Sequence, residues 1–180
     1  MKTYVLGFLF SPDLESVLLM QKNRPAWQAG HFNGIGGKIE SGETPLDAMA
    51  RECHEETGVL IAPWREFCVM GNDQWRVHCF YVQWLDPWNN GKPCPATTKT
   101  DEPVLWVKCS EIPNMLVIPN LTWLVPMALD AIQSFGLRAT VQVDDPPLTE
   151  PQYYESKKIP HTTWCGCSTP KADPQTATDP

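Results

Sequence analysis

The sequence lacks several features that define specialised classes of protein. No apolar run approaches the ~20 residues that span a membrane. The N-terminal apolar stretch Tyr4–Phe10 has no small-residue cleavage site after it, so we expect no signal peptide. No internal repeat is visible, and 21 Asp and Glu outnumber 14 Lys and Arg, for a net charge of −7. This balance argues against a broad surface for duplex nucleic acid.

The sequence also lacks a paired cysteine framework, because its seven cysteines are odd in number and irregularly spaced. We therefore expect reduced thiols and a cytoplasmic location. Cys165 and Cys167, together with His161, could bind a metal. Their C-x-C spacing is a weak signal, since structural zinc sites usually show two ligand pairs.

The 180 residues are enough for one domain with a core and additional chain. Hydrophobic residues are 42% and charged residues 19%, which is ordinary globular composition. From about Asp144 the chain becomes polar, Pro-rich and poor in aliphatic residues. Such a segment buries too little apolar surface to offset its ordering entropy. We expect a folded domain over 1–143 and a mostly disordered tail over 144–180.

Runs of β-forming residues and two helical patterns predict an alternation of strands and helices. The expected strands are Tyr4–Phe10, Val17–Gln21, Glu66–Met70, Trp75–Leu85 and Val104–Lys108. The expected helices are Thr44–Thr57 and Asn120–Phe135, and Pro126 predicts a kink or a later start in the second. The segments Asn23–Gly37 and Asp86–Asp101 read as loops.

The first helix has strong end signals. Thr44 suits the N-cap, Pro45 the first helical position, and Asp47 nearly completes a capping box. Gly58 suits the left-handed position that ends a helix. The spacing predicts a buried apolar stripe of Leu46, Met49, Ala50, Cys53 and Thr57.

Three acids on this helix oppose its local stability. At about 100° per residue, Glu52, Glu55 and Glu56 share one arc beside the apolar stripe, and their side chains should converge. They repel one another, and the macrodipole disfavours anions in the second half of a helix. A solvated face would interleave more lysine than this helix has, and only Arg51 is available. Converging carboxylates instead suit Mg²⁺ or Mn²⁺ and phosphate chemistry.

The run from Gly37 to Val59, with Glu43 and the core R-E-C-x-E-E-x-G-V, resembles the Nudix box at every fixed position. The resemblance implies the Nudix fold, an α/β/α sandwich around a mixed β-sheet. It also implies Mg²⁺- or Mn²⁺-dependent hydrolysis of a nucleoside diphosphate linked to another group, a small-molecule nucleotide being the partner.

The same resemblance assigns roles by position. Glu52, Glu55 and Glu56 would hold metal, with a backbone carbonyl of Gly36 or Gly37. Arg51 would orient the carboxylates, and Glu43 would brace the junction of loop and helix. Glu102, just before the strand L-W-V-K, would complete the metal shell or act as base. Which glutamate accepts the proton of the attacking water stays open.

The loop WQAGHFNGIGGK, from Trp27 to Lys38, resembles that of MutT-type oxidised-purine nucleoside triphosphatases. The resemblance implies that Asn33 pairs with a base, Trp27 stacks on it, and Lys38 belongs to the substrate site. His31 could touch a phosphate. Core packing for Trp27 and a turn role for Asn33 stay open as alternatives.

The chain departs from these relatives after Pro119, where they carry an acidic pair and this chain has Asn120 and Leu121. Ile118 also replaces their tryptophan. Asn120 could contact a base with different selectivity or simply cap the second helix. We expect a nucleoside triphosphate pyrophosphohydrolase. The alternatives are a Nudix hydrolase of dinucleotides, nucleotide sugars or capped RNA ends, and a non-catalytic nucleotide-binding module.

Overall fold

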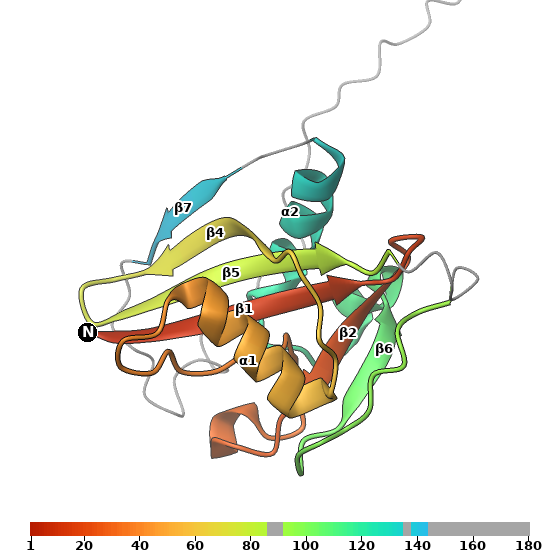
Figure 1. Ribbon diagram of the computed structural model, residues 1–180, viewed down its shortest axis with the longest axis horizontal. Helices are drawn as coiled ribbons and strands as arrows, with labels where there is room; N and C mark the ends of the chain where they lie inside the picture. Colours follow the sequence, from red (N-terminus) through yellow and green to blue (C-terminus); the bar gives the residue numbers. More distant parts are fainter. Residues whose placement is uncertain (86–91, 135–137, 144–180) are drawn as a thin grey trace, which may run out of the picture. The chain divides into compact units, whose positions relative to one another are not determined.

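A computed structural model of the chain describes residues 1–85, 92–134 and 138–143 (Figure 1). Its strands are β1 (Lys2–Phe10), β2 (Ser16–Gln21), β3 (Phe32–Asn33), β4 (Arg65–Gly71), β5 (Trp75–Gln83), β6 (Val104–Lys108) and β7 (Ala139–Gln142). Its helices are α1 (Pro45–Thr57) and α2 (Leu121–Gln133), with short 3₁₀ turns η1 (Ala26–Gln28) and η2 (Cys109–Asn114). The expected tail over 144–180 and its Cys165–Cys167 motif lie outside the described residues.

The strands form one sheet in the order β3-β2-β1-β5-β4-β7, and β6 also pairs with β2. Strands β1 and β5 run parallel along nine paired positions, from Lys2 to Phe10, and β4 and β7 are also parallel. The remaining pairs are antiparallel. The sheet is therefore mixed, as expected.

Strand β1 separates two hydrophobic layers, because successive side chains of a strand point to opposite faces. Val5 and Leu9 join the cluster that contains the buried side of α1. Leu6, Phe8 and Phe10 join the cluster that contains the buried side of α2. The two helices therefore cover opposite faces of the sheet, as Figure 1 shows, and the α/β/α sandwich is confirmed.

The ends of α1 follow the chemistry of its sequence. The Thr44 hydroxyl accepts a hydrogen bond from the Asp47 backbone N–H at 3.2 Å, and Pro45 occupies the first turn. Gly58 ends the helix at φ 72°, a left-handed conformation that costs glycine little, and its N–H donates to the His54 carbonyl. Both predicted ends are confirmed.

The predicted buried stripe of α1 is partly wrong. Leu46 and Ala50 are exposed, whereas Met49, Cys53 and Thr57 are buried, together with Ala48 and Glu56. The buried face is thus rotated away from Leu46, because the first turn of α1 lies over a cavity beside β4 and β5 and not over packed core. Apolar spacing alone does not reveal which end of a helix overhangs the sheet.

Other element boundaries also differ from the sequence predictions. Strand β7 and the turn η2 were not predicted, and α2 begins at Leu121 with Pro126 inside it, so the later start is wrong. Asn120 precedes α2 with helical backbone angles, φ −66° and ψ −20°, and its side chain caps nothing. The capping alternative for Asn120 is therefore wrong, because a side-chain cap needs an extended backbone at that position.

The packing of α1 gives a test on stability. Met49→Ala removes a fully buried side chain and should lower the free energy of unfolding by about 2–5 kcal/mol. Leu46→Ala, in the same helix but 48% exposed, should change it by less than about 0.5 kcal/mol. Urea denaturation of both variants measures the two values. An equal loss of unfolding free energy in the two variants would contradict the finding that Met49 is on the buried face of α1 and Leu46 is not.

Candidate functional site

The site is built around a glycine segment that runs along the edge of β1. The Val5 N–H donates to the Gly37 carbonyl at 2.9 Å, and Gly7 forms a β-bridge with Ile35. Gly36 has a φ of 145°, and a side chain there would overlap the Val5 backbone. Only glycine allows this close approach, which brings the backbone of the segment against the end of α1.

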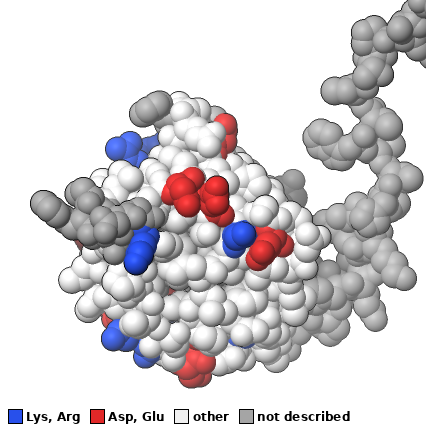
Figure 2. Space-filling view, turned by 90° about the vertical axis from the view of Figure 1, so that its right-hand side faces the viewer, with Lys and Arg blue, Asp and Glu red and all other residues white. Residues whose placement is uncertain are grey.

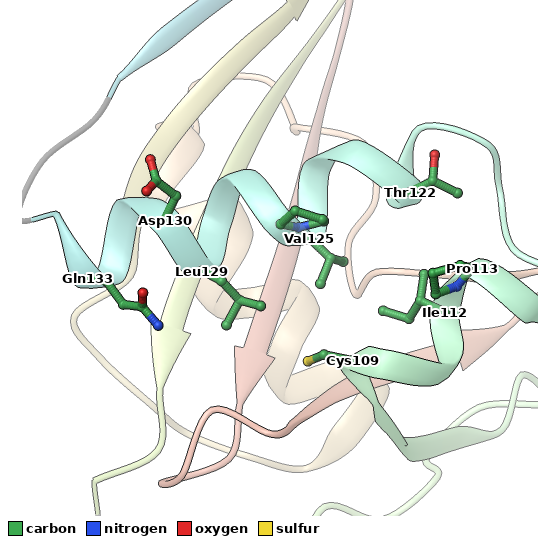
Figure 3. A pocket seen from close by; sticks show the side chains of 9 residues that line it. Cys109, Ile112, Pro113, Thr122, Val125, Leu129, Asp130 and Gln133 are labelled. Atoms are coloured by element: carbon green, nitrogen blue, oxygen red, sulfur yellow. The ribbon is translucent and has the colours of Figure 1, made fainter. Parts of the chain in front are cut away.

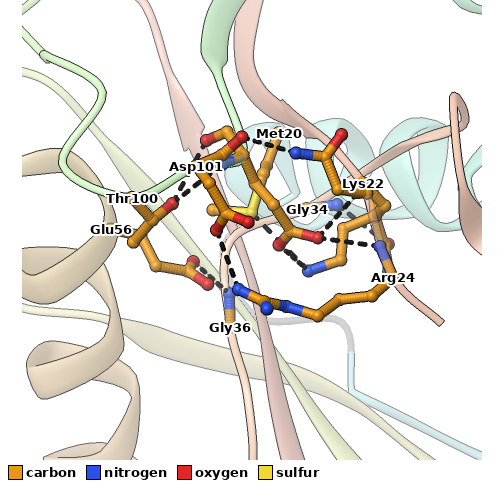
Figure 4. Close-up of polar contacts among 11 residues, drawn as sticks. Met20, Lys22, Arg24, Gly34, Gly36, Glu56, Thr100 and Asp101 are labelled. Atoms are coloured by element: carbon orange, nitrogen blue, oxygen red, sulfur yellow. Dashed lines mark hydrogen bonds and ion pairs between the residues drawn. The ribbon is translucent and has the colours of Figure 1, made fainter.

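Glu56 is buried at the inner side of this segment, with 9% of its surface exposed. Its Oε2 accepts a hydrogen bond from the Gly36 N–H at 3.0 Å (Figure 4). Burial raises the pKa of Glu56 to about 8, although the Gly36 N–H and the Lys22 charge act in the opposite direction. Burial thus disfavours the charged form of Glu56, and local contacts offset only part of this cost.

Glu52 lies one helical turn earlier and adjoins the same glycines. A Cβ atom added at Gly37 would overlap the Glu52 carboxylate, so the absence of a side chain at Gly37 is what admits it. Burial raises the pKa of Glu52 and outweighs the neighbouring Arg51 guanidinium. Two carboxylates with raised pKa values therefore stand beside one backbone segment.

Arg51 connects the acids of the helix to the loop before it. Its Nε and Nη2 donate to the Glu43 carboxylate at 2.9 and 3.0 Å, and its Nη1 donates to Glu52 and Glu55, each at 3.0 Å. Its Nη2 also donates to the Lys38 carbonyl at 3.2 Å. These contacts raise the pKa of Arg51, Glu43 foremost. The planar guanidinium of Arg51 thus holds three carboxylates and one backbone carbonyl at once.

Glu52 and Glu55 meet at one nitrogen of Arg51, whereas Glu56 bonds to Gly36, so the convergence of all three on one ion stays a prediction. Glu55 is 56% exposed and turns toward Arg51, whereas Glu52 and Glu56 face the glycines. In the part of the chain that the structure describes, no three His, Cys, Asp or Glu side chains are grouped closely enough to hold a metal ion. Among the three, Glu55 is the most exposed, and its carboxylate pairs with Arg51 one helical turn earlier.

Glu102 is buried, and its carboxylate is bonded to the turn that follows β2. It forms an ion pair with Lys22 and accepts hydrogen bonds from the backbone N–H groups of Asn23, at 2.8 Å, and Arg24, at 3.3 Å. Burial raises its pKa, but the bonds to Lys22 and Asn23 outweigh this, and the net pKa lies below the usual value. Glu102 therefore holds the turn that follows β2.

The C-terminal end of α1 is tied to the segment that carries Glu102. The Lys99 N–H donates to the Glu56 carbonyl at 3.1 Å, and the Thr97 N–H donates to the Thr57 carbonyl at 3.0 Å. These bonds satisfy carbonyls that the helix itself leaves without donors. They also hold the segment that leads to Glu102 against the end of α1.

The predicted substrate residues come from two neighbouring segments. Trp27, in η1, packs against the core layer beneath α2. The Asn33 Oδ1 accepts from the Gly34 N–H at 2.9 Å, and the Lys38 side chain is exposed. The Ile118 N–H donates to the Phe32 carbonyl, which places the chain before Asn120 beside β3. The Asn120 Oδ1 is buried and has no hydrogen-bond partner among the residues that the structure describes.

Sequence reasoning did not identify Lys22 as part of the site. Its ammonium pairs with Glu102 and also acts on the Glu56 carboxylate. The sequence shows only a lysine directly after the strand Ser16–Gln21. A solvated lysine is common at such a position, so it gives no sign of a site. Its partner lies 80 residues further along the chain, so no local pattern could reveal the pair.

Other surfaces offer less for phosphate chemistry. A hollow of about 280 Å³ between η2 and α2 (Figure 3) has one carboxylate, Asp130, and no basic side chain in its described lining. On the face shown in Figure 2, Lys and Arg side chains are scattered and do not gather in a patch. Among the described residues, no helix is long and apolar enough to cross a membrane.

The fold and this glutamate–glycine site together define a known class of protein. The family model of the NUDIX domain matches residues 2–124, well over half of the chain. The chain belongs to the Nudix family.

Particular relatives share shorter stretches. The chain is 40% identical over 60 residues to the oxidized purine nucleoside triphosphate hydrolase of Mus musculus, covering 33% of this chain and 36% of the relative. It is 32% identical over 98 residues to the NAD-capped RNA hydrolase NudC of Vibrio parahaemolyticus, covering 54% and 35%. The matches thus span about a third of the length of these curated relatives.

Solved structures agree on the fold. A structure from work on MutT of Aliivibrio salmonicida and Vibrio cholerae superimposes with a TM-score of 0.57 at 25% identity, covering 74% of this chain and 98% of that one. The NUDIX domain of Shewanella oneidensis NrtR, complexed with ADP ribose, gives 0.61 at 18% identity, covering 72% and 87%. The second likeness shows the fold alone.

The Arg51 fork predicts a pH-dependent stability difference. The Arg51 bond lowers the pKa of Glu43 below 4.5, so this contribution is present above the unfolded-state pKa and is lost as pH falls through the folded-state value. Arg51→Gln should therefore raise the pKa of Glu43 and lower Tm at neutral pH. The difference in Tm should shrink in acid.

Carboxyl NMR titration and thermal melts measure the two effects. Arg76→Gln, an exposed arginine of β5, is the control and should leave both unchanged. A Tm difference that persists unchanged down to pH values below the Glu43 titration would contradict this account.

Proposed function

We propose that the protein is a Mg²⁺-dependent nucleoside triphosphate pyrophosphohydrolase, which releases a nucleoside monophosphate and pyrophosphate. The observation that carries the proposal is the buried Glu56 carboxylate, held by the Gly36 N–H beside Glu52. The likeness to the oxidized purine nucleoside triphosphate hydrolase of Mus musculus supports the triphosphate class.

The residues of the site fit a hard divalent cation. Mg²⁺ and Mn²⁺ prefer oxygen ligands, and Glu52 and Glu56 bring carboxylates beside the glycine segment, where a carbonyl of Gly36 or Gly37 would add a further oxygen. The Gly37 carbonyl already accepts from the Val5 N–H. Burial raises the pKa of both glutamates, so a nearby cation would relieve the cost of their charge. Glu55, which is exposed and bound to Arg51, would join as a third ligand by turning away from Arg51.

The cation would supply Lewis-acid polarisation of phosphoryl oxygens and a water of lowered pKa. The chain's own residues do the rest. Arg51 holds Glu52 in place through its fork. The glycine backbone lets the phosphates approach without steric hindrance. The proton of the attacking water passes to one carboxylate of the set Glu52, Glu56 and Glu102.

The nucleobase of the substrate is held by the segments that meet beside β3. We propose that Trp27 stacks on the base and that Asn33 and Asn120 hydrogen-bond its edge. The Asn120 Oδ1 supports this, because a buried acceptor without a donor is costly and a base N–H would satisfy it. His31 and Lys38, at the two ends of the glycine-rich loop, are proposed to contact phosphate.

A second candidate function is hydrolysis of another nucleoside diphosphate derivative, such as a dinucleotide or a capped RNA end. The longer match, 98 residues, is to the NAD-capped RNA hydrolase NudC. The net charge of −7 argues against a long RNA substrate. The same glutamates would serve either reaction, so the substrate decides between the two.

The deciding assay offers unmodified and oxidised nucleoside triphosphates, NADH, ADP-ribose and NAD-capped RNA, each with Mg²⁺. Turnover of triphosphates with release of pyrophosphate is expected. Turnover of the diphosphate derivatives with triphosphates untouched would favour the second candidate. No turnover of any substrate would leave the non-catalytic module as the better description.

Glu56→Gln tests the proposed metal site. The change keeps the shape of the side chain but removes its charge, so turnover should fall by at least the roughly 10–100-fold that loss of a supporting metal contact costs. Glu111→Gln, on exposed η2, is the matched control and should retain full activity. Equal activity of the two variants would show that the metal site is elsewhere.

Asn120→Leu tests base recognition and is close to isosteric. It removes the unpaired acceptor, so the folded protein should keep or gain stability, while KM for the best triphosphate rises roughly 5–30-fold. Steady-state kinetics on the substrate panel, with a thermal melt of the same sample, separates the two effects. An unchanged KM on every substrate would remove Asn120 from the site.

We also propose a reducing, cytoplasmic location. The support is that Cys53, Cys68, Cys79, Cys94 and Cys109 are all free thiols, although Cys68 and Cys79 are directly paired across β4 and β5. A cross-strand pair of thiols in a secreted protein would be exposed to oxidation. Fractionation of cells that express the full chain tests the location.

A further inference from the structure

Lys22, the first residue after β2, is held more firmly than a surface lysine. Its backbone N–H donates to the His31 carbonyl at 2.8 Å, and its carbonyl accepts from the Gly30 N–H at 2.7 Å. These two bonds close the loop that contains η1 at its base. The backbone of Lys22 is therefore fixed from both directions, and its side chain starts from a defined position.

The side chain of Lys22 is largely withdrawn from water and paired with Glu102. The exposed fractions of the two side chains are 16% for Lys22 and 7% for Glu102, and the ammonium meets the Oε2 atom of Glu102. The Met20 sulfur lies 3.6 Å from the Lys22 Nζ (Figure 4). Salt screens charges that are so little exposed only weakly. Removing one partner would leave the other charge uncompensated, so the two side chains hold each other in place.

The contacts of Glu102 leave little of its carboxylate for another ligand. Oε1 accepts from the backbone N–H groups of Asn23, at 2.8 Å, and Arg24, at 3.3 Å, while Oε2 meets the Lys22 ammonium. A carboxylate offers about four lone-pair sites on its two oxygens. Oε2, whose partner is a side chain, is the oxygen that can change partner without disturbing the backbone.

The Lys22 ammonium also lies within electrostatic reach of the glutamate–glycine site. Burial is the largest cause of the raised pKa of Glu56, and the charge of Glu102 adds to it, whereas the charge of Lys22 lowers it. Glu56 and Glu102 therefore repel each other, and Lys22 offsets part of this repulsion. A divalent cation beside Glu56 would compete with Lys22 for the same negative charge.

We propose that Lys22 is a positioning residue that keeps Glu102 away from the metal. Its ammonium occupies Oε2, the oxygen that would otherwise turn toward a cation at Glu56. The metal is then held from the α1 side, by Glu52 and Glu56, while Glu102 keeps its bonds to the turn after β2. This inference rests on the proposed metal site, in which Lys22 has no part.

A supporting role for Lys22 predicts the opposite effect on metal binding. If Lys22 oriented Glu102 as a metal ligand, its removal would weaken binding, since groups that orient ligands contribute roughly 10–100-fold in affinity. If Lys22 keeps Glu102 away, its removal frees an anionic ligand and takes away a competing charge. Metal binding should then tighten, so the sign of the change separates the two roles.

Lys22→Met tests this, because methionine keeps an unbranched apolar stem and lacks the ammonium. Calorimetric titration of the full chain with Mn²⁺, without nucleotide, should show an affinity about tenfold higher than that of the unaltered chain. Lys22→Arg keeps the charge and should restore the original affinity. Lys22→Gln is a second neutral variant, with the same expected gain, should Lys22→Met fail to fold.

Arg24→Gln is the matched control, because it removes a positive charge from the same turn. Its guanidinium is 73% exposed and pairs with Asp101, so salt screens it and the affinity for Mn²⁺ should change by less than about twofold. An equal gain in Arg24→Gln and Lys22→Met would overturn the proposal, because any nearby charge would then have the same effect.

The double variant Lys22→Met, Glu102→Gln tests whether Glu102 carries the effect. With no carboxylate to release, most of the gain should disappear when this variant is compared with Glu102→Gln alone. The same gain in both backgrounds would show that Lys22 does not act by holding Glu102, and it would overturn the proposal. Unchanged or weaker Mn²⁺ affinity in Lys22→Met would overturn it as well.

Failure of the proposed function has a different signature. If the unaltered chain binds Mn²⁺ but cleaves no nucleotide, the proposed reaction fails, while the effect of Lys22→Met on Mn²⁺ affinity is still expected. If the unaltered chain binds no Mn²⁺, or if Glu56→Gln binds it as tightly as the unaltered chain, the proposed metal site and this inference are both overturned.

Discussion

A carboxylate buried against a glycine backbone is the constraint on which the rest of the site depends. Glu56 can be withdrawn from water only because Gly36 offers it an N–H at 3.0 Å, and Gly36 can stand there only because it has no side chain. The same contact joins the glycine segment, which pairs with β1, to the last turns of α1. In turn, the burial of Glu56 raises its pKa to about 8.

The two faces of the sheet, one covered by α1 and the other by α2, carry different parts of the site. The α1 face carries the acids and the glycine segment, whereas the α2 face provides the larger apolar layer, on which Trp27 and the start of α2 rest. Because β1 contributes alternate residues to both layers, a single strand supports the acidic region on one face and the layer that Trp27 packs against on the other. A shift of β1 by one residue would disturb both regions together.

Much of the fold and the acidic helix could be predicted from sequence, because both rest on local patterns. Thr44, Pro45 and Gly58 mark the ends of α1, and the spacing of Glu52 and Glu56 brings them to one side. The rotation of Glu55 toward Arg51, the exposure of Leu46 and the pairing of Lys22 with Glu102 could not be predicted. The last two depend on contacts between segments far apart in the chain, for which spacing carries no information. Glu55 meets Arg51 within one helical turn, but Arg51 is placed by its bonds to Glu43 and Lys38 outside the helix.

Two backbone bonds join Thr97 and Lys99 to the end of α1. They divide the chain between β5 and Glu102 into a part before the bonds and a part after them. A change in chain length before Thr97 leaves the spacing from this anchor to Glu102 unaltered. Between Lys99 and Glu102 only two residues intervene, so a single insertion there would carry the carboxylate away from Lys22. Length variation among homologues should therefore accumulate before the anchor and stop abruptly at it.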